Sequence, residues 1–290
     1  MLTSPLLKPE AGTEGIRWAG GFSLVSYGVR IGIRADNLSA LAKLKQLLPP
    51  GWKPSDSARG ERTYSLVTGG TDSAGRSRLR GKRGRKVLYV GDTELENSGN
   101  LRDVFDRFEA DLQLHVAEYA KRRVFVHSGS VGWRGKAIII PGRSFSGKST
   151  LVAALVRAGA VFYSDEYAVL DSRGRVHPFP KPLALRRDGS EEQTRVPVER
   201  IGGKAGSRPI SVGMIVVSNY KAGANWRPRR LSPGKGALEL LSNAVPARSN
   251  PVMALNVLRR VVSGAPVFKG QRGSADETAR LILQRFDETC

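Results

Sequence analysis

Cysteine is almost absent from this sequence: a single residue, Cys290, occupies the last of its 290 positions. One thiol cannot form a disulfide bond within the chain, and it cannot supply a metal site built from several thiolates. Scarcity of cysteine is typical of proteins kept in a reducing compartment, so we expect a cytoplasmic location.

Long apolar runs are missing as well. No stretch approaches the roughly 18 consecutive apolar residues of a transmembrane helix. Residues 1–12 lack the basic start and the apolar centre of a signal peptide. The sequence therefore predicts a soluble protein with no membrane partner.

Acidic residues are few compared with basic ones: 26 Asp and Glu stand against 47 Lys and Arg, which gives a net charge of +21. Such an excess suits an acidic partner, a nucleic acid or an anionic substrate. It equally suits arginines spread over a solvated surface, because no recognised nucleic-acid-binding motif accompanies the charge. A Gly- and Ser-rich loop at 69–85 either grips phosphates or forms a solvated hairpin tip. Its basic residues are Arg76, Arg78, Arg80, Lys82, Arg83 and Arg85.

The pattern of apolar residues indicates two regions. The first, 1–121, is expected to be a smaller α+β N-terminal region, without catalytic residues of its own and suited to substrate selection. Strands are expected at 62–67 and 86–90, and a strand or a hairpin at 22–34. Helices are expected at 38–48, capped by Asp36 or Asn37, and at 101–122, capped by Asn100. The second helix places His115 on its apolar side, which favours a structural role for this residue.

The second region, 122–290, is expected to be an α/β domain. Strands are predicted at 123–127 and 136–140, with Gly129, Gly132 and Gly135 in the turns between them. Further along the chain we expect a hairpin at 167–179, irregular structure at 181–204, a buried strand at 210–217, and helices at 236–242, 251–263 and 275–287.

The motif of this region lies between the apolar run 137–141 and a helical pattern at 151–157. It reads Gly-Arg-Ser-Phe-Ser-Gly-Lys-Ser-Thr and matches the P-loop pattern G-x-x-x-x-G-K-[ST]. In a P-loop, backbone N–H groups and the N-terminus of the next helix hold phosphate groups. Lys148 would reach the β- and γ-phosphates of ATP, and the Ser149 hydroxyl would bind Mg²⁺. The expected ATP-binding residues are Gly142, Arg143, Ser144, Phe145, Ser146, Gly147, Lys148, Ser149 and Thr150.

An acidic pair, Asp165–Glu166, follows the next expected strand at 161–165. Strand, P-loop, helix and strand form a βαβ unit, whose two strands we expect to lie parallel in one sheet and to end at one edge. There a carboxylate can hold Mg²⁺ through water or take the proton from an attacking hydroxyl. We predict both acids as catalytic residues, and Ser149 with Asp165 as the magnesium-binding pair. The alternative is a surface acidic pair at a strand end.

His127 ends the strand before the P-loop strand, so it can emerge at the same edge. A histidine within hydrogen-bond reach of Asp165 or Glu166 would orient the carboxylate and help to move a proton near neutral pH. We predict His127 and Lys148 as the remaining catalytic residues, although His127 alone would also suit a structural role. His177, which precedes two prolines, is expected to be structural.

The succession of His127, the P-loop and Asp165–Glu166 resembles the C-terminal domain of HPr kinase/phosphorylase, over about residues 123–190. The resemblance implies an HPr-kinase/PEP-carboxykinase-like fold and ATP- and Mg²⁺-dependent phosphorylation of a serine-type hydroxyl. It also implies that Asp165, Glu166 and His127 act as base and metal-organising residues. The parent family runs the reverse reaction with inorganic phosphate and assembles into rings, which implies a homo-oligomer. Glu166 departs from the family, which has a second Asp there.

Three functions remain open at this point. The first is a kinase that acts on a hydroxyl of a protein, peptide or small molecule, with Arg143 or Arg248 beside the γ-phosphate. The second is a non-kinase P-loop ATPase or nucleotide-switched regulator that binds nucleic acid through its basic loops. The third is a binding module that retains nucleotide without turning it over.

Overall fold

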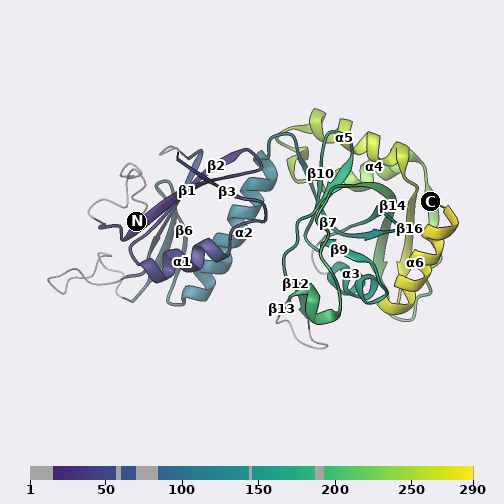
Figure 1. Ribbon diagram of the computed structural model, residues 1–290, viewed down its shortest axis with the longest axis horizontal. Helices are drawn as coiled ribbons and strands as arrows, with labels where there is room; N and C mark the ends of the chain where they lie inside the picture. The colour runs from purple at the N-terminus through teal and green to yellow at the C-terminus, as the bar shows by residue number, and fades with distance from the viewer. Residues whose placement is uncertain (1–15, 57–59, 70–83, 144–145, 187–192, 290) are drawn as a thin grey trace. The chain divides into compact units, whose positions relative to one another are not determined.

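The computed structural model describes residues 16–56, 60–69, 84–143, 146–186 and 193–289. The chain divides into two compact units, Met1–Lys121 and Arg122–Cys290, and each unit packs helices on a sheet of its own (Figure 1). Within the described ranges, no helix combines the length and the apolar character needed to cross a bilayer. Most of the basic loop at 69–85 and residue Cys290 lie outside the described residues.

The first unit is a six-stranded sheet with two helices. Its strands follow the order β3-β1-β2-β4-β5-β6, with β2 and β4 parallel and the other pairs antiparallel. The elements are β1 Gly20–Ser26, β2 Val29–Ala35, α1 Leu38–Gln46, β3 Lys53–Ser55, β4 Arg62–Val67, β5 Lys86–Val90, β6 Thr93–Ser98 and α2 Leu101–Tyr119. This unit combines helices and strands, and β3 and β6 are strands that the sequence analysis did not predict.

Both helices of this unit begin at an asparagine. The side chain of Asn37 accepts a hydrogen bond from the Ala40 N–H group, and that of Asn100 accepts one from Arg102, which satisfies otherwise unpaired N–H groups of the first turn. His115 of α2 is half-buried, and its ring lies 4.7 Å from that of Tyr119. Burial lowers its pKa to about 4, so it is neutral at pH 7, as a structural histidine would be.

The second unit is built around an eight-stranded sheet. The strand order is β11-β10-β7-β8-β14-β16-β15, and β9 pairs with β7 beside β10. Strands β8, β14 and β16 run parallel to one another, whereas β7 is antiparallel to all its neighbours. The strands are β7 Val124–Trp133, β8 Lys136–Pro141, β9 Val161–Ser164, β10 Tyr167–Leu170, β11 Arg175–His177, β14 Ile210–Tyr220, β15 Arg229–Leu231 and β16 Val267–Arg272. The helices are α3 Lys148–Arg157, α4 Pro233–Leu241, α5 Pro251–Gly264 and α6 Ala275–Thr289, with a short 3₁₀ helix, η2, at Val245–Ala247.

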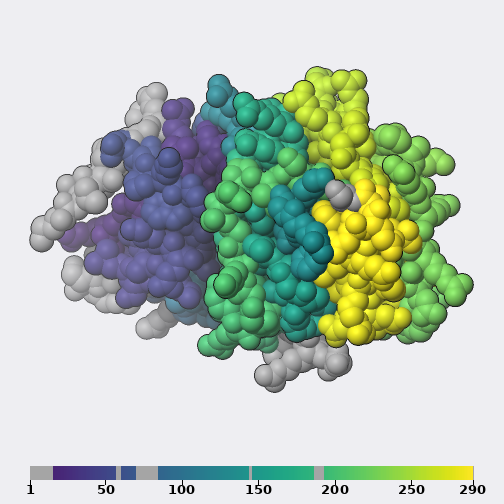
Figure 2. Space-filling model, turned by 45° about the vertical axis from the view of Figure 1, so that its right-hand side comes forward, coloured from purple at the N-terminus to yellow at the C-terminus, as the bar shows by residue number. Residues whose placement is uncertain are grey.

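Helices cover this sheet on both faces. Ile138 and Ile140 of β8 pack with α3 and α6, whereas Ile139 between them packs with α4 and α5. Successive side chains of a strand point to opposite faces, so a strand covered on both sides reads as a continuous apolar run. Figure 2 shows α6 (yellow) lying against the α3 region (teal) on one face. The second unit is therefore a helix–sheet–helix sandwich, a mixed α/β fold.

Strand β7 is longer than expected, and the prediction of three turn glycines is wrong for two of them. Gly129 and Gly132 lie inside β7, and the turn to β8 uses Arg134 and Gly135. A Cβ atom on Gly129 would collide with the side chain of Val152 in α3, and one on Gly132 would lie 3.0 Å from the ring of Tyr163. These glycines allow close packing in the middle of a strand, a role that sequence alone does not separate from a turn.

Strands β8 and β9 run in the same direction within one sheet, as expected, because both are antiparallel to β7. They are not neighbours, however, since β7 lies between them and pairs with both. Strand β7 pairs with β8 on one side and β14 pairs with it on the other, so no side of β8 is left for pairing with β9. The βαβ unit therefore spans three strands instead of two.

The expectation of irregular structure at 181–204 is also wrong. This segment forms an antiparallel pair, β12 Leu183–Arg186 and β13 Gln193–Val196, followed by the 3₁₀ helix η1, Val198–Ile201. Leu183 and Leu185 alternate along β12 and pack in the cluster that contains α3. Two alternating leucines among charged residues are too short a pattern to predict a strand from the sequence.

Candidate functional site

The predicted P-loop, residues 142–150, connects β8 to α3. Ser144 and Phe145 lie outside the described residues, whereas Gly142, Arg143 and the segment 146–150 are described. Gly147 directly precedes α3 with a φ of 79°, a left-handed conformation that glycine adopts without strain. The N-terminus of α3, with its unpaired N–H groups, therefore opens directly from this loop.

Lys148 folds back over the predicted P-loop. Its side chain is buried, and Nζ donates a hydrogen bond to the carbonyl oxygen of Arg143 at 2.8 Å. Burial lowers the pKa of Lys148 to about 8, and the nearby carboxylates of Asp165 and Glu166 oppose this shift. The ammonium group is thus held close to both members of the acidic pair.

The acidic pair forms a bend between β9 and β10. The two strands follow each other along β7, with Ser164 opposite Ser130 and Tyr167 opposite His127. The Ser164 hydroxyl accepts hydrogen bonds from the N–H groups of Glu166 (3.1 Å) and Tyr167 (3.0 Å). These bonds hold the bend and place both acids beside the middle of β7.

Two successive residues of β7 connect the acidic pair with the predicted P-loop. The N–H group of Gly142 donates to the carbonyl oxygen of His127 at 3.3 Å. On the other side of β7, the N–H group of Ser128 donates to the carbonyl oxygen of Glu166 at 3.1 Å. The structure therefore brings the start of the predicted P-loop, His127 and the acidic pair together at the carboxyl ends of β8 and β9.

Asp165 is the buried member of the pair. Burial raises its pKa, and four interactions oppose this shift: hydrogen bonds from the Ala184 N–H group, the Ser149 hydroxyl and the residue's own N–H group, and the charge of Lys148. The Ala184 N–H group donates to Oδ2 at 3.1 Å. The carboxylate therefore has hydrogen-bond donors on both sides and a cation nearby.

Glu166 differs from Asp165 in exposure and partner. Its side chain is 37% exposed, and one carboxylate oxygen lies 3.9 Å from Nζ of Lys181. Glu166 is therefore better solvated than the buried Asp165, so the two acids lie in different environments.

Ser149 and Asp165 are the residues that could hold a metal ion. Within the described residues, no cluster of three or more His, Cys, Asp or Glu side chains is available for a metal. Magnesium is commonly held by one or two carboxylates together with substrate phosphates and water. The donor set present thus fits Mg²⁺ that arrives with a nucleotide, not a metal held by protein ligands alone.

His127 is half-buried beside the predicted P-loop. Burial and the charge of Lys148 lower its pKa to about 4, and a hydrogen bond with the backbone of Gly142 opposes the shift. Its ring lies 5.9 Å from that of Tyr167, edge to face. In the protein without nucleotide, His127 is therefore neutral at pH 7 and supports the loop through Gly142.

One residue of this site, Arg272, was missed in the sequence analysis. It ends β16, and its Nη2 atom donates to the carbonyl oxygen of Gly147 at 2.7 Å. Arg143 and Arg248, the arginines suggested from the sequence, are both exposed. The available signal was the short strand-like segment Val267–Arg272, which lies just before α6. Its position beside the predicted P-loop depends on the pairing of β16 with β14, which local sequence patterns do not predict.

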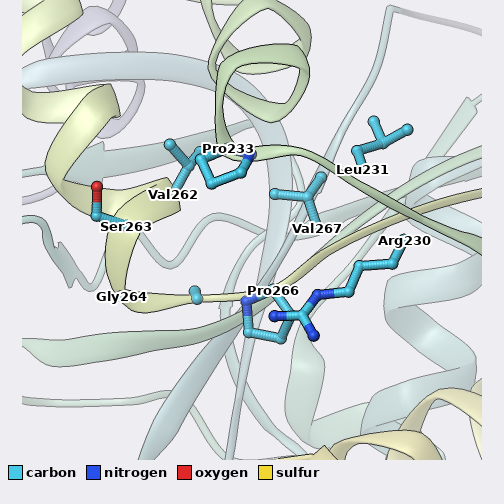
Figure 3. Close-up of a pocket in the computed structure, with 9 residues that line it drawn as sticks. Arg230, Leu231, Pro233, Val262, Ser263, Gly264, Pro266 and Val267 are labelled. Atoms are coloured by element: carbon cyan, nitrogen blue, oxygen red, sulfur yellow. The ribbon is translucent and has the colours of Figure 1, made fainter.

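The pocket drawn in Figure 3 lies at the other end of β16. It measures about 220 Å³ and is lined by residues that include Arg230, Pro233, Val262, Pro266 and Val267. Val267 begins β16, whereas Arg272 at its end contacts the predicted P-loop. This pocket is therefore separate from the site that contains Asp165 and Lys148.

Comparison with known proteins identifies no family. No protein-family model matches the sequence, and no curated protein matches it. Among solved structures, the HPr(Ser) kinase/phosphatase from Coxiella burnetii is similar, with 13% sequence identity, a TM-score of 0.33, and coverage of 57% of this chain and 95% of that chain. A similarity of this size carries no argument about function, so a function has to be argued from the site.

Proposed function

We propose that the protein is an ATP- and Mg²⁺-dependent kinase that phosphorylates a serine-type hydroxyl of a protein, a peptide or a small molecule. The main support is the buried carboxylate of Asp165, which lies beside the Ser149 hydroxyl and Lys148 at the edge where the predicted P-loop begins. A phosphate grip combined with a buried carboxylate is the arrangement that phosphoryl transfer to a hydroxyl requires.

In this reaction the acceptor oxygen forms a bond with the γ-phosphorus, and the bond from that phosphorus to the bridging oxygen of ADP breaks. The hydroxyl proton passes to a base, for which Asp165 is the candidate. Burial raises the pKa of Asp165, and a carboxylate with a raised pKa takes up a proton more readily. Lys148 and the N-terminus of α3 would stabilise the charge on the phosphate oxygens. Mg²⁺ bound to the Ser149 hydroxyl, with Asp165 contacting it through water, would add to this neutralisation.

A non-kinase ATPase that acts on nucleic acid is the second candidate, because the net charge of +21 favours an anionic partner. It predicts ATP hydrolysis that DNA or RNA stimulates, with binding that weakens steeply as salt rises. The homo-oligomer and the cytoplasmic location stay predictions under either function.

The ratio of products distinguishes the two candidates. The purified protein is incubated with Mg²⁺, γ-labelled ATP and either a cell lysate or nucleic acid, and ADP, inorganic phosphate and labelled acceptor are measured. A kinase forms ADP together with labelled acceptor and little free phosphate, whereas an ATPase forms ADP and phosphate in equal amounts. Lys148→Met should abolish the activity, and Asp276→Asn, an exposed acid of α6 paired with Arg157, serves as the control. ATP binding without any product would leave only a binding module.

A further inference from the structure

Arg272 is a buried cation without an acidic partner. Its residue surface is 2% exposed. Among the described residues, no carboxylate forms an ion pair with it, and its Nε atom is buried with no hydrogen-bond partner. Burial of the guanidinium group lowers its pKa, and its closest aromatic neighbour is Tyr220, whose ring centre lies 5.7 Å away.

The hydrogen bonds of Arg272 go to carbonyl oxygens, most of them in the predicted P-loop. Nη2 donates to Gly147 at 2.7 Å and to Ser146 at 3.4 Å, and Nη1 donates to Gly273 at 3.4 Å. Neutral carbonyl groups satisfy donors but do not cancel a charge. Moving an ion out of water is unfavourable, and the carbonyl groups compensate only part of this cost.

These contacts, together with the helical hydrogen bond from the Leu151 N–H group to the Gly147 carbonyl at 3.1 Å, hold the direction in which the loop's N–H groups point. Within a planar trans peptide, the carbonyl group and the following N–H group point in opposite directions. Since Arg272 holds the carbonyls of Ser146 and Gly147, the N–H groups of Gly147 and Lys148 must point away from it. These groups stand at the N-terminus of α3, where helical N–H groups have no partner within the helix and bind anions.

Gly147 makes this arrangement sterically possible. A Cβ atom at this position would collide with Nη2 of Arg272, so a larger residue could not keep the contact. The glycine of the motif therefore serves two purposes: the left-handed turn into α3 and the close approach of the guanidinium group.

We propose that Arg272 is a positioning residue for the phosphate groups of the bound nucleotide. It orients the N–H groups that receive the phosphates, and these phosphates are the counter-charge that the described residues do not supply. The proposal rests on the proposed nucleotide binding. It adds to it the residue that binds the carbonyl groups of the loop on the side opposite the N–H groups.

The test compares ATP affinity with the stability of the unliganded protein. In calorimetric titrations, Arg272→Met should weaken ATP binding at least tenfold. Arg272→Lys, which retains the charge but cannot reach two carbonyls in the same way, should fall between Arg272→Met and the wild type. Without nucleotide, the melting temperature of Arg272→Met should equal or exceed that of the wild type, because an uncompensated buried charge has been removed. Arg229→Met, which removes an exposed arginine of β15, should leave both quantities unchanged.

The outcomes separate the inference from the proposed function. A wild-type chain that binds neither ATP nor inorganic tripolyphosphate would contradict nucleotide binding itself. Wild-type binding with equal affinity in Arg272→Met would contradict only the role of Arg272. A melting temperature that falls together with the affinity would also overturn the inference, because Arg272 would then be a structural support of the loop. If Arg272→Met does not fold, Arg272→Lys decides the question through the same two measurements.

Discussion

The main-chain N–H group of Ala184 donates a hydrogen bond to Oδ2 of Asp165 at 3.1 Å. Ala184 belongs to β12, so a later strand of the chain returns to hold the acid that precedes β10. A hydrogen bond to the charged form of a carboxylate favours ionisation and fixes the direction of its oxygens. Asp165 is therefore oriented as well as buried, which a base for a bound hydroxyl requires.

Asp165→Asn should separate chemistry from structure. An asparagine oxygen can still accept the hydrogen bond from Ala184, but it cannot accept a proton at neutral pH. We expect phosphoryl transfer to fall by about 10²–10⁴-fold, the usual contribution of a general base, with little change in melting temperature. Glu166→Gln should cost much less, because Glu166 is exposed. Full transfer activity in Asp165→Asn would refute the assignment of the base.

The affinity for ATP should depend on pH through Lys148. Its pKa of about 8 in the unliganded protein means that the ammonium group loses its proton above this pH. Binding of phosphates to the charged form then weakens by up to about tenfold for each further pH unit. Titrations between pH 7 and pH 9.5 would measure this, and Lys148→Arg is the control because arginine keeps its charge over the whole range.

The stability of the unliganded protein should change in the opposite direction over the same range. The pKa of Lys148 is lowered from 10.5 to about 8, so the unfolded chain binds more protons between these two values. Stability then rises as pH increases from 8 toward 10.5, because the cost of burying the charge disappears. Chemical denaturation of the wild type and of Lys148→Met would show this as a difference in slope. Equal slopes for the two proteins would contradict the lowered pKa.

Gly147→Ala should be more harmful than backbone strain alone predicts. Gly147 and Gly135 share a φ of 79°, but a Cβ atom at Gly135 has open space within 4 Å, whereas one at Gly147 collides with Arg272. Gly135→Ala therefore measures the strain of the left-handed conformation, about 1–2 kcal/mol. Gly147→Ala should lose more stability than this and should also weaken ATP binding. Identical losses in the two variants would show that the new methyl group at position 147 does not meet Arg272.

Gly129→Ala tests the close approach of α3 to β7. The new methyl group would meet Val152, and overpacking of this kind costs about 1–3 kcal/mol of stability. The additional change Val152→Ala makes room for the methyl group, so the double variant should be more stable than the sum of the single effects predicts. A double-mutant cycle by chemical denaturation measures the coupling. Purely additive losses would mean that the two residues do not meet in solution.

Local patterns in the sequence predicted most elements that depend on local chemistry. The helices predicted at 38–48 and 101–122 lie close to α1 and α2, and the strands at 62–67 and 86–90 were predicted at the residues where β4 and β5 lie. The predicted P-loop and the acidic pair lie at one edge of the sheet, and each is a short contiguous motif. Their roles as a nucleotide site and as catalytic acids stay predictions.

Features that depend on pairing between distant residues were not predicted. The position of β7 between β8 and β9 depends on which strand occupies each edge, and alternating apolar residues do not encode this choice. Arg272 contacts Gly147 only because β16 pairs with β14, far from the motif in sequence. Gly129 and Gly132 were placed in turns because a glycine required by a neighbouring helix looks the same in sequence as one required by a turn.

The placement of His127 and Ser128 side by side in β7 has a consequence for how this protein can fail. The carbonyl group of His127 accepts a hydrogen bond from Gly142, and the N–H group of Ser128 donates one to Glu166. The position of the predicted P-loop relative to the acidic pair therefore depends on two consecutive residues of β7. One extra residue inserted in β7 between His127 and Ser128 would shift one motif against the other while each kept its own local structure. Under the proposed function, the altered chain would still fold and bind ATP. The γ-phosphate would then no longer lie beside Asp165, so ATP would be bound without phosphoryl transfer.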